Sequence, residues 1–198
     1  MATIDKALIQ ELREITGLGM MDCKKALEET GGNIEASVEL LRKKGALVAA
    51  KRGARATAEG IVHAYIHPGD RVGVMVEINC ETDFVARTAD VNQFAKDLCM
   101  HIAALKPLYL DQTSVDQAYV AKEREIVKEQ MANSGKPENV INQIVEGKLK
   151  KVYSEICLLN QQFVKNDQFT VQEMLMQLIA KTGENVVIKR FARFEIGS

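Results

Sequence analysis

Several residue types and patterns are rare or absent in this sequence, and each absence excludes a class of protein. It contains no tryptophan, three prolines and only 5% aromatic residues among its 198, and it has no apolar run of the roughly 18 residues that a membrane span needs. Its 26 basic and 27 acidic residues leave a net charge of −1, so no overall field attracts nucleic acid or anionic lipid. Residues 1–15 are polar and amphipathic, unlike a signal peptide. We therefore expect neither a membrane partner nor direct nucleic-acid binding.

The cysteines form no recognisable framework. Four are present, they lie far apart in the chain, and none belongs to a Cys-x-x-Cys pair. This pattern indicates reduced, mostly buried thiols in a cytoplasmic protein, without disulfides and without a zinc site. We expect no metal and no cofactor. The residues are Cys23, Cys80, Cys99 and Cys157.

Motifs of catalysis are also missing. The glycine pairs at 17/19 and 31/32 lack the preceding strand and the Lys-Ser/Thr ending of a phosphate-binding loop, and neither Gly-x-Ser-x-Gly nor His-Glu-x-x-His occurs. A thiol enzyme could pair Cys80 or Cys99 with one of the three histidines, but such pairings arise by chance in most domains. His101 follows Met100 on an expected core helix and is interpreted as a packed histidine. The pattern favours a binding protein over an enzyme.

Three short helices are predicted within the first 45 residues. Apolar residues recur at helical spacing over residues 4–15, and Thr3 can cap that helix. Glycines at 17 and 19 end it, and glycines at 31 and 32 end a second helix. Asn33 can cap a third helix, which Gly45 closes. The expectation is a small helical bundle.

The stretch Arg42–Arg55 contains six basic residues and no acidic one. It is either a nucleic-acid patch or a solvated helix end followed by a linker. The second interpretation is favoured, because no aromatic residue is interleaved for base stacking and because basic residues complement a helix C-terminus.

The remaining two thirds predict an α+β domain. Strands are expected at Gly60–Ile66 and Val72–Asn79 around a turn at 67–70, from their alternating apolar residues. A last strand at Val186–Ile196 is predicted to pair back onto these two. Sheet and segregated helices together define the α+β class.

Helices fill the interval between those strands. One helix, with apolar residues from Val91 to Leu105, is ended by Pro107. A helical hairpin covers about 115–152, with its turn at residues 133–137 and Pro137 in the first turn of its second helix. Thr170 and Glu173 form a capping box that opens one more helix.

The junction Cys80–Ala86, between a strand and a helix, allows two interpretations. Asp83 can cap a helix that starts near Phe84, while Phe84 and Val85 fold back on the sheet. Alternatively, the segment Thr82–Val85 is a probe for another molecule. Local pattern alone favours the cap, just as Met20 and Met21 alone are more simply core residues than a docking surface.

Four stretches resemble one family in order and spacing. They are Leu12–Leu27, Val76–Ala86, Gly147–Lys151 together with Leu158–Val164, and Ile188–Glu195. From end to end the chain resembles bacterial elongation factor Ts, in its short form with one core sheet unit. The resemblance implies a three-helix bundle like a ubiquitin-associated domain (UBA-like) at 1–54, and an α+β core domain at 55–198.

The same resemblance implies a guanine nucleotide exchange factor for elongation factor Tu. In that family a Thr-Asp-Phe-Val tip enters the G domain of the GTPase and disturbs its Mg²⁺ site, so that GDP leaves. A homodimer is also implied, because one sheet unit is half of the long form's pair. The alternative function is a module that recruits protein or RNA through the bundle and Arg42–Arg55. The residues carried over are the tip Thr82, Asp83, Phe84 and Val85, the docking residues Arg13, Met20 and Met21, and His67, which would touch a neighbouring domain of the GTPase.

Overall fold

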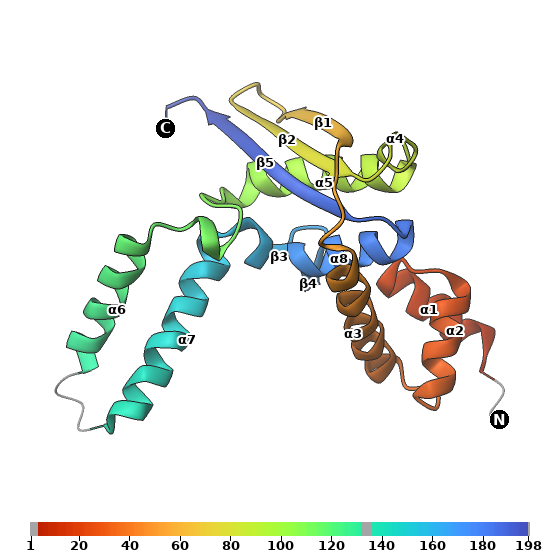
Figure 1. The fold of residues 1–198 in the computed structure, drawn as a ribbon, viewed down its shortest axis with the longest axis horizontal. Coiled ribbons are helices and arrows are strands. Elements are labelled where there is room, and N and C mark those ends of the chain that lie inside the picture. The colour runs from red at the N-terminus through yellow and green to blue at the C-terminus, as the bar shows by residue number, and fades with distance from the viewer. Residues whose placement is uncertain (1–3, 132–135, 198) are drawn as a thin grey trace.

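A computed structural model describes residues 4–131 and 136–197 (Figure 1). Its centre is a three-stranded antiparallel sheet in the order β1 (Glu59–Ile66), β2 (Val72–Cys80) and β5 (Val186–Glu195). The final strand therefore pairs with the early hairpin, as predicted, in a register that places Cys80 opposite Val186. A bulge between Glu77 and Ile78 interrupts this second pairing.

One face of the sheet is covered and the other is open. Val74, Val76 and Ile78 of β2 are buried, whereas Met75 between them is 48% exposed, which is the period of two expected of a half-buried strand. Helix α5 (Ala89–Leu105) packs across the buried face, with α8 (Val171–Thr182) beyond it (Figure 1). The predicted helix before Pro107 is thus confirmed.

One local prediction in this core is confirmed at atomic detail, and a second feature was not foreseen. Thr170 and Glu173 form a reciprocal capping box at the start of α8. Gly60 lies where the backbones of β1 and β2 approach closely. A Cβ at this position would lie 2.3 Å from the carbonyl oxygen of Ile78. Any larger residue would push β1 away from β2 near the end of the sheet.

The N-terminal helices are α1 (Lys6–Thr16), α2 (Met20–Glu29) and α3 (Ile34–Arg52). They enclose a small apolar core of their own, and Asp5 rather than the expected Thr3 is the cap of α1. Thr3 lies outside the described residues. Core members of this bundle are Ile9, Leu12, Leu18, Cys23, Ala26, Leu27 and Leu41.

The predicted end of the third helix at Gly45 is wrong. Helix α3 continues to Arg52, and Gly45 is buried against α8, where its missing Cβ would lie 3.9 Å from the carbonyl oxygen of Met176. The glycine allows the two helices to approach closely, and the contact of Val48 and Ala49 with the main core offsets its helix cost of about 1 kcal/mol. One continuous helix therefore joins bundle and core, where a linker was expected.

The helical hairpin consists of α6 (Gln117–Met131) and α7 (Glu138–Ile156). Val127, Val145 and Leu149 lie in its apolar seam. Pro137 precedes α7 at the cap position, while residues 133–135 of the predicted turn lie outside the described part of the chain. Short elements complete the fold: α4 (Asp83–Ala86), β3 (Gln162–Phe163), β4 (Asn166–Thr170), and two 3-10 turns at Gln112–Ser114 and Leu158–Asn160.

The molecule has two helical arms below a sheet. The α6–α7 hairpin forms one arm and the α1–α3 bundle the other, and α4 lies at the bundle's end of the sheet (Figure 1). Helices and antiparallel strands are segregated, which confirms the α+β class. Within the described residues, no helix is both long and apolar enough to cross a membrane.

Candidate partner-binding site

The segment Thr82–Val85 forms a sharp corner after β2. Thr82 is the N-cap of α4, because its hydroxyl oxygen accepts a hydrogen bond from the Val85 N–H at 3.4 Å. Asp83 is the first residue of the helix and pairs with Arg87 at 3.1 Å. The prediction that Asp83 is the cap is therefore wrong: both residue types are good caps, and here Thr82 takes the role.

Phe84 points away from the protein. Its side chain is 81% exposed, whereas Val85 packs partly against the core and Ala86 is buried. The idea that Phe84 folds back on the sheet is thus overturned, because the helical turn that buries Val85 and Ala86 directs Phe84 to the opposite side. An isolated phenyl ring left in water forgoes roughly 1.5–3 kcal/mol of burial free energy. That free energy remains available to a partner.

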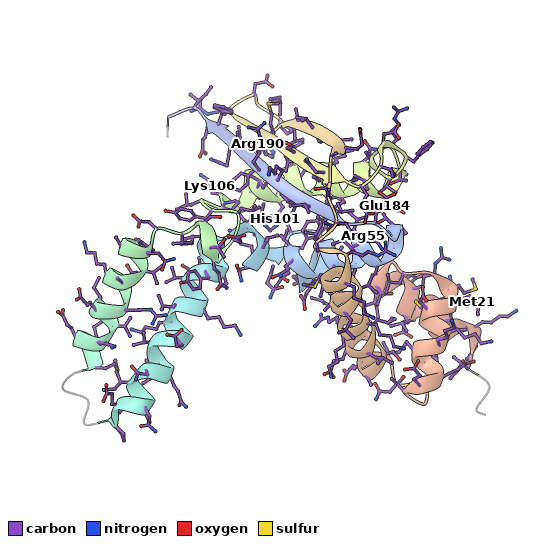
Figure 2. The ribbon with its side chains drawn as sticks, viewed as in Figure 1. Met21, Arg55, His101, Lys106, Glu184 and Arg190 are labelled. Carbon is purple, nitrogen blue, oxygen red and sulfur yellow. The ribbon has the colours of Figure 1, made fainter. Side chains whose placement is uncertain are left out.

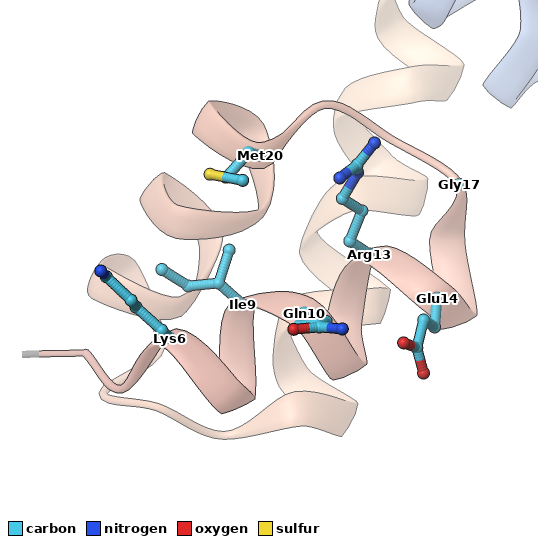
Figure 3. Close-up of a pocket in the computed structure, with 7 residues that line it drawn as sticks. All are labelled: Lys6, Ile9, Gln10, Arg13, Glu14, Gly17 and Met20. Carbon is cyan, nitrogen blue, oxygen red and sulfur yellow. The ribbon is translucent and has the colours of Figure 1, made fainter.

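A second surface lies on the N-terminal bundle. Met20 and Met21, at the start of α2, are each 60% exposed, and Arg13 on α1 is exposed as well. The expectation from local pattern that the methionines fill the core is wrong. Arg13 and Met20 line an open groove of about 700 Å³, in which α1 supplies most of the wall (Figure 3). The remaining lining residues are Lys6, Ile9, Gln10, Glu14 and Gly17.

His67 lies apart from both surfaces. It occupies the turn between β1 and β2, where its Nδ1 is 3.1 Å from the hydroxyl of Tyr65. Since β2 begins just after this turn and ends at Cys80, the nine-residue strand separates His67 from the tip by on the order of 25 Å. The structure therefore gathers the tip and the bundle at one end and leaves His67 at the other.

Comparison with known proteins decides the family. The family model described as "Elongation factor TS" matches residues 3–198. Elongation factor Ts of Carboxydothermus hydrogenoformans is 54% identical over 194 residues, covering 98% of this chain and 89% of the relative. The chain belongs to the elongation factor Ts family. Further relatives of that name occur in Thermoanaerobacter sp., at 53% identity over 98% of this chain and 95% of the relative, and in Desulforamulus reducens, at 51% over 100% and 91%.

In this member of the elongation factor Ts family, part of the basic stretch pairs within the chain. The guanidinium of Arg42 lies 4.3 Å from the centre of the Phe169 ring and 3.8 Å from the carboxylate of Glu173. These contacts fasten α3 to the core. Three further basic side chains pair within the chain: Lys43 with Glu39, Lys44 with Glu29 and Arg55 with Glu81, at 2.7, 2.6 and 3.2 Å. These pairs neutralise part of the charge of the stretch, in keeping with its interpretation as a solvated helix end.

The cysteines serve packing. Cys80 and Cys99 are fully buried, and burial raises the pKa of each thiol to about 11, with the charge of Glu184 contributing at Cys80. A neutral, buried thiol is not a nucleophile, which argues against the thiol-enzyme alternative. His101 is buried as expected: its Nε2 lies 2.9 Å from Gln161 Oε1, and its Nδ1 accepts from the Val164 N–H.

Proposed function

We propose that the chain is a guanine nucleotide exchange factor for elongation factor Tu, acting through the tip Thr82–Val85. The observation that carries the proposal is Phe84, 81% exposed on a one-turn helix at the end of the sheet, in a member of the elongation factor Ts family. In this proposal Phe84 enters the G domain close to the nucleotide, and Asp83 contacts the same region. Insertion disturbs the Mg²⁺ site and the phosphate loop, so GDP is released.

The physical requirement for exchange is differential binding. The factor makes and breaks no covalent bond; it stabilises the nucleotide-free GTPase more than the GDP-bound form. Each tenfold acceleration of release requires about 1.4 kcal/mol of such difference. Burial of one exposed aromatic anchor in a partner contributes about 2 kcal/mol or more, so Phe84 alone supplies a substantial part.

The bundle supplies a second contact in this proposal. Arg13, Met20 and Met21 dock on another face of the G domain. Their helices α1 and α2 lie at the same end of the molecule as α4 (Figure 1), where Figure 2 labels Met21, so one partner can engage both. The methionine side chains are flexible and polarisable, and they adapt to an apolar partner surface. His67 meets a neighbouring domain of the GTPase from the far end of the sheet.

The domain division at 1–54 and 55–198 and the UBA-like character of the bundle belong to the same proposal. The separate apolar core of α1–α3 supports them. The continuous helix α3 adds that the bundle is held in a defined orientation, so that docking through Met20 and Met21 presents the tip to one region of the partner.

We also propose a homodimer through the open face of the sheet. Val62, Ile66, Met75 and Phe194 are exposed on that face, at 63%, 60%, 48% and 68%. Glu77 and Arg190 pair beside them at 2.6 Å, so the face carries both charges, and a second copy related by a two-fold axis would meet each charge with its opposite in this proposal. Sedimentation at micromolar concentration should give twice the mass of one chain, and Met75→Glu should halve it. A single-chain mass for the unaltered protein would contradict the dimer.

Complex formation tests the exchange function directly. Purified chain is mixed with elongation factor Tu, and the complex is separated by gel filtration with and without GDP. We expect a stable complex without nucleotide that dissociates when GDP is added, because the coupling between nucleotide and factor is reciprocal. Binding that GDP does not weaken, or RNA retained in place of the GTPase, would favour the alternative recruiting module.

A further inference from the structure

The tip rests against a second corner of the chain that is distant in sequence. Helix α8 ends at Thr182, Gly183 turns the chain at φ 74°, and β5 begins at Val186. Since Val186 pairs with Cys80, residues 184–185 lie directly beside residues 81–82 at the end of the sheet. Figure 2 labels Glu184 and Arg55 at this place, next to α4.

Glu184 binds both polar donors of Thr82. One carboxylate oxygen accepts from the Thr82 hydroxyl at 2.7 Å, and the other accepts from the Thr82 N–H at 3.0 Å. The same hydroxyl oxygen accepts from the Val85 N–H. The carboxylate is thus connected through Thr82 to the first turn of α4. Hydrogen bonds to an ionised carboxylate are about twice as strong as neutral ones.

A second set of bonds holds the preceding residue. Glu81 accepts from the Asn185 N–H at 2.6 Å and from the Arg55 guanidinium at 3.2 Å, and the Asn185 side chain donates to the Arg55 carbonyl at 2.9 Å. The Asn185 N–H, followed by Arg55, lowers the pKa of Glu81. Two successive residues at the base of the tip are therefore anchored by one corner.

A one-turn helix needs such external support. Four residues cannot maintain helical structure by their own hydrogen bonds, because nucleation is unfavourable. Phe84 makes little contact with the protein and cannot orient the segment itself. If the tip were mobile, docking would have to order it, and that entropy would be subtracted from the binding free energy.

We propose that Glu184 is a positioning residue for exchange: through its two bonds to Thr82 it fixes α4 so that Phe84 is presented in the orientation that inserts into the partner. The proposal rests on the proposed exchange function. It assigns to Glu184 no contact with the GTPase or the nucleotide. Its effect reaches the partner only through Phe84.

The chain offers a closely matched control on the same helix. Glu173 binds the N–H and hydroxyl of Thr170 at 2.7 and 3.1 Å, the same chemistry at the opposite end of α8. Glu184→Ala and Glu173→Ala each remove a carboxylate that holds a threonine. Only Glu184→Ala removes it from the tip.

The first measurement is amide hydrogen exchange of the free protein. The Ala86 and Arg87 N–H groups bond to Thr82 and Asp83 carbonyls at 3.2 and 3.1 Å, so they report on α4. Glu184→Ala should lower their protection about tenfold relative to the unaltered protein, whereas Glu173→Ala should leave them unchanged. Retained protection in Glu184→Ala would overturn the proposal whatever the partner is.

The second measurement is GDP release from elongation factor Tu at increasing factor concentration. Glu184→Ala should lower the rate at saturation about tenfold with little change in the half-saturating concentration, and Glu184→Gln, which keeps one acceptor oxygen, should fall between. In a Phe84→Ala background, Glu184→Ala should change the rate less than about twofold, since coupled residues are not additive.

The outcomes separate the two claims. A full Glu184→Ala effect in the Phe84→Ala background would show that Glu184 acts on overall stability and would overturn the positioning role. If Phe84→Ala itself leaves GDP release unchanged, the proposed function fails, and the amide protection still decides whether Glu184 holds the tip.

Discussion

The two ends of the central sheet are built in different ways. At the end of β2, residues 81–82 are held by Glu184 and Asn185, which lie about a hundred residues away in sequence. At the other end, the turn around His67 closes on itself: His67 N–H donates to the Val72 carbonyl at 2.9 Å, and Asp70 N–H donates to the His67 carbonyl at 3.0 Å. In our proposal the long-range bonds hold an exposed phenyl ring in one orientation, whereas the bonds named at the turn are local and orient no such anchor. The larger functional effects are therefore expected at the tip.

The largest expected effect is at Phe84. Phe84→Ala should slow GDP release from elongation factor Tu by about 30-fold or more, because the lost anchor contributes about 2 kcal/mol or more. The melting temperature should not change, since the ring is 81% exposed. Leu108→Ala is the matched control: Leu108 is 70% exposed away from the tip, and its loss should leave release unaffected. Equal rates for Phe84→Ala and the unaltered protein would remove the functional difference between the two ends.

Met20 and Met21 rank second. The double change to Ala should raise the half-saturating factor concentration about tenfold while leaving the rate at saturation close to that of the unaltered protein. These side chains supply docking and not insertion, so they affect binding in the ground and nucleotide-free states alike. Titration of the factor in a GDP-release assay separates the two quantities. If only the rate at saturation fell and the half-saturating concentration did not change, the methionines would act in insertion, as proposed for the tip, and not in docking.

Acidification should lower the stability of both ends of the central sheet together, because α5 packs along the sheet and carries His101. Burial, the first cause, lowers the pKa of His101 from its ordinary value of 6.5, while the bond to Gln161 opposes this. The neutral ring stabilises the fold above pH 6.5, and this stabilisation is lost as the pH falls through the pKa of His101 in the folded protein. Protonation also removes the bond from the Val164 N–H, at a cost of about 1 kcal/mol.

Thermal melts between pH 7.5 and 5 measure that loss. His101→Gln, which can still donate and accept but does not titrate here, should flatten the profile over this interval. An unchanged slope in His101→Gln would assign the acid sensitivity to other groups.

The smallest expected effect is at His67. His67→Ala removes one exposed hydrogen bond with Tyr65 and should change GDP release less than about threefold. The assay is the one used for Phe84→Ala. A loss above tenfold would make the turn a principal contact and would invert the proposed ranking of the two ends.

The regular parts of the fold could be predicted because their signals are local. Alternation in β2, the helix before Pro107 and the capping box at Thr170 each require only a few neighbouring residues, and each is confirmed. Pairing of β5 with β2 is long-range, yet two strands with one apolar face each have few other partners. The error at Gly45 had a tertiary cause: contact with α8 outweighs the low helix propensity of glycine.

The site was predictable only in part for a related reason. Thr82 and Asp83 are both good capping residues, and the choice between them depends on Glu184, which has no local signal in the sequence. The exposure of Phe84 likewise follows from the burial of Val85 and Ala86 on the side facing the core. A one-turn helix takes its direction from its surroundings, so its side chains cannot be assigned to inside or outside from spacing alone.

The most direct test of the central claim is the rate at which elongation factor Tu releases a fluorescent GDP analogue, followed by stopped flow with and without this chain at saturation. The proposed function predicts release that is faster by at least tenfold with the chain present, and the acceleration should disappear largely in Phe84→Ala. Release at the same rate with and without the folded chain would contradict it.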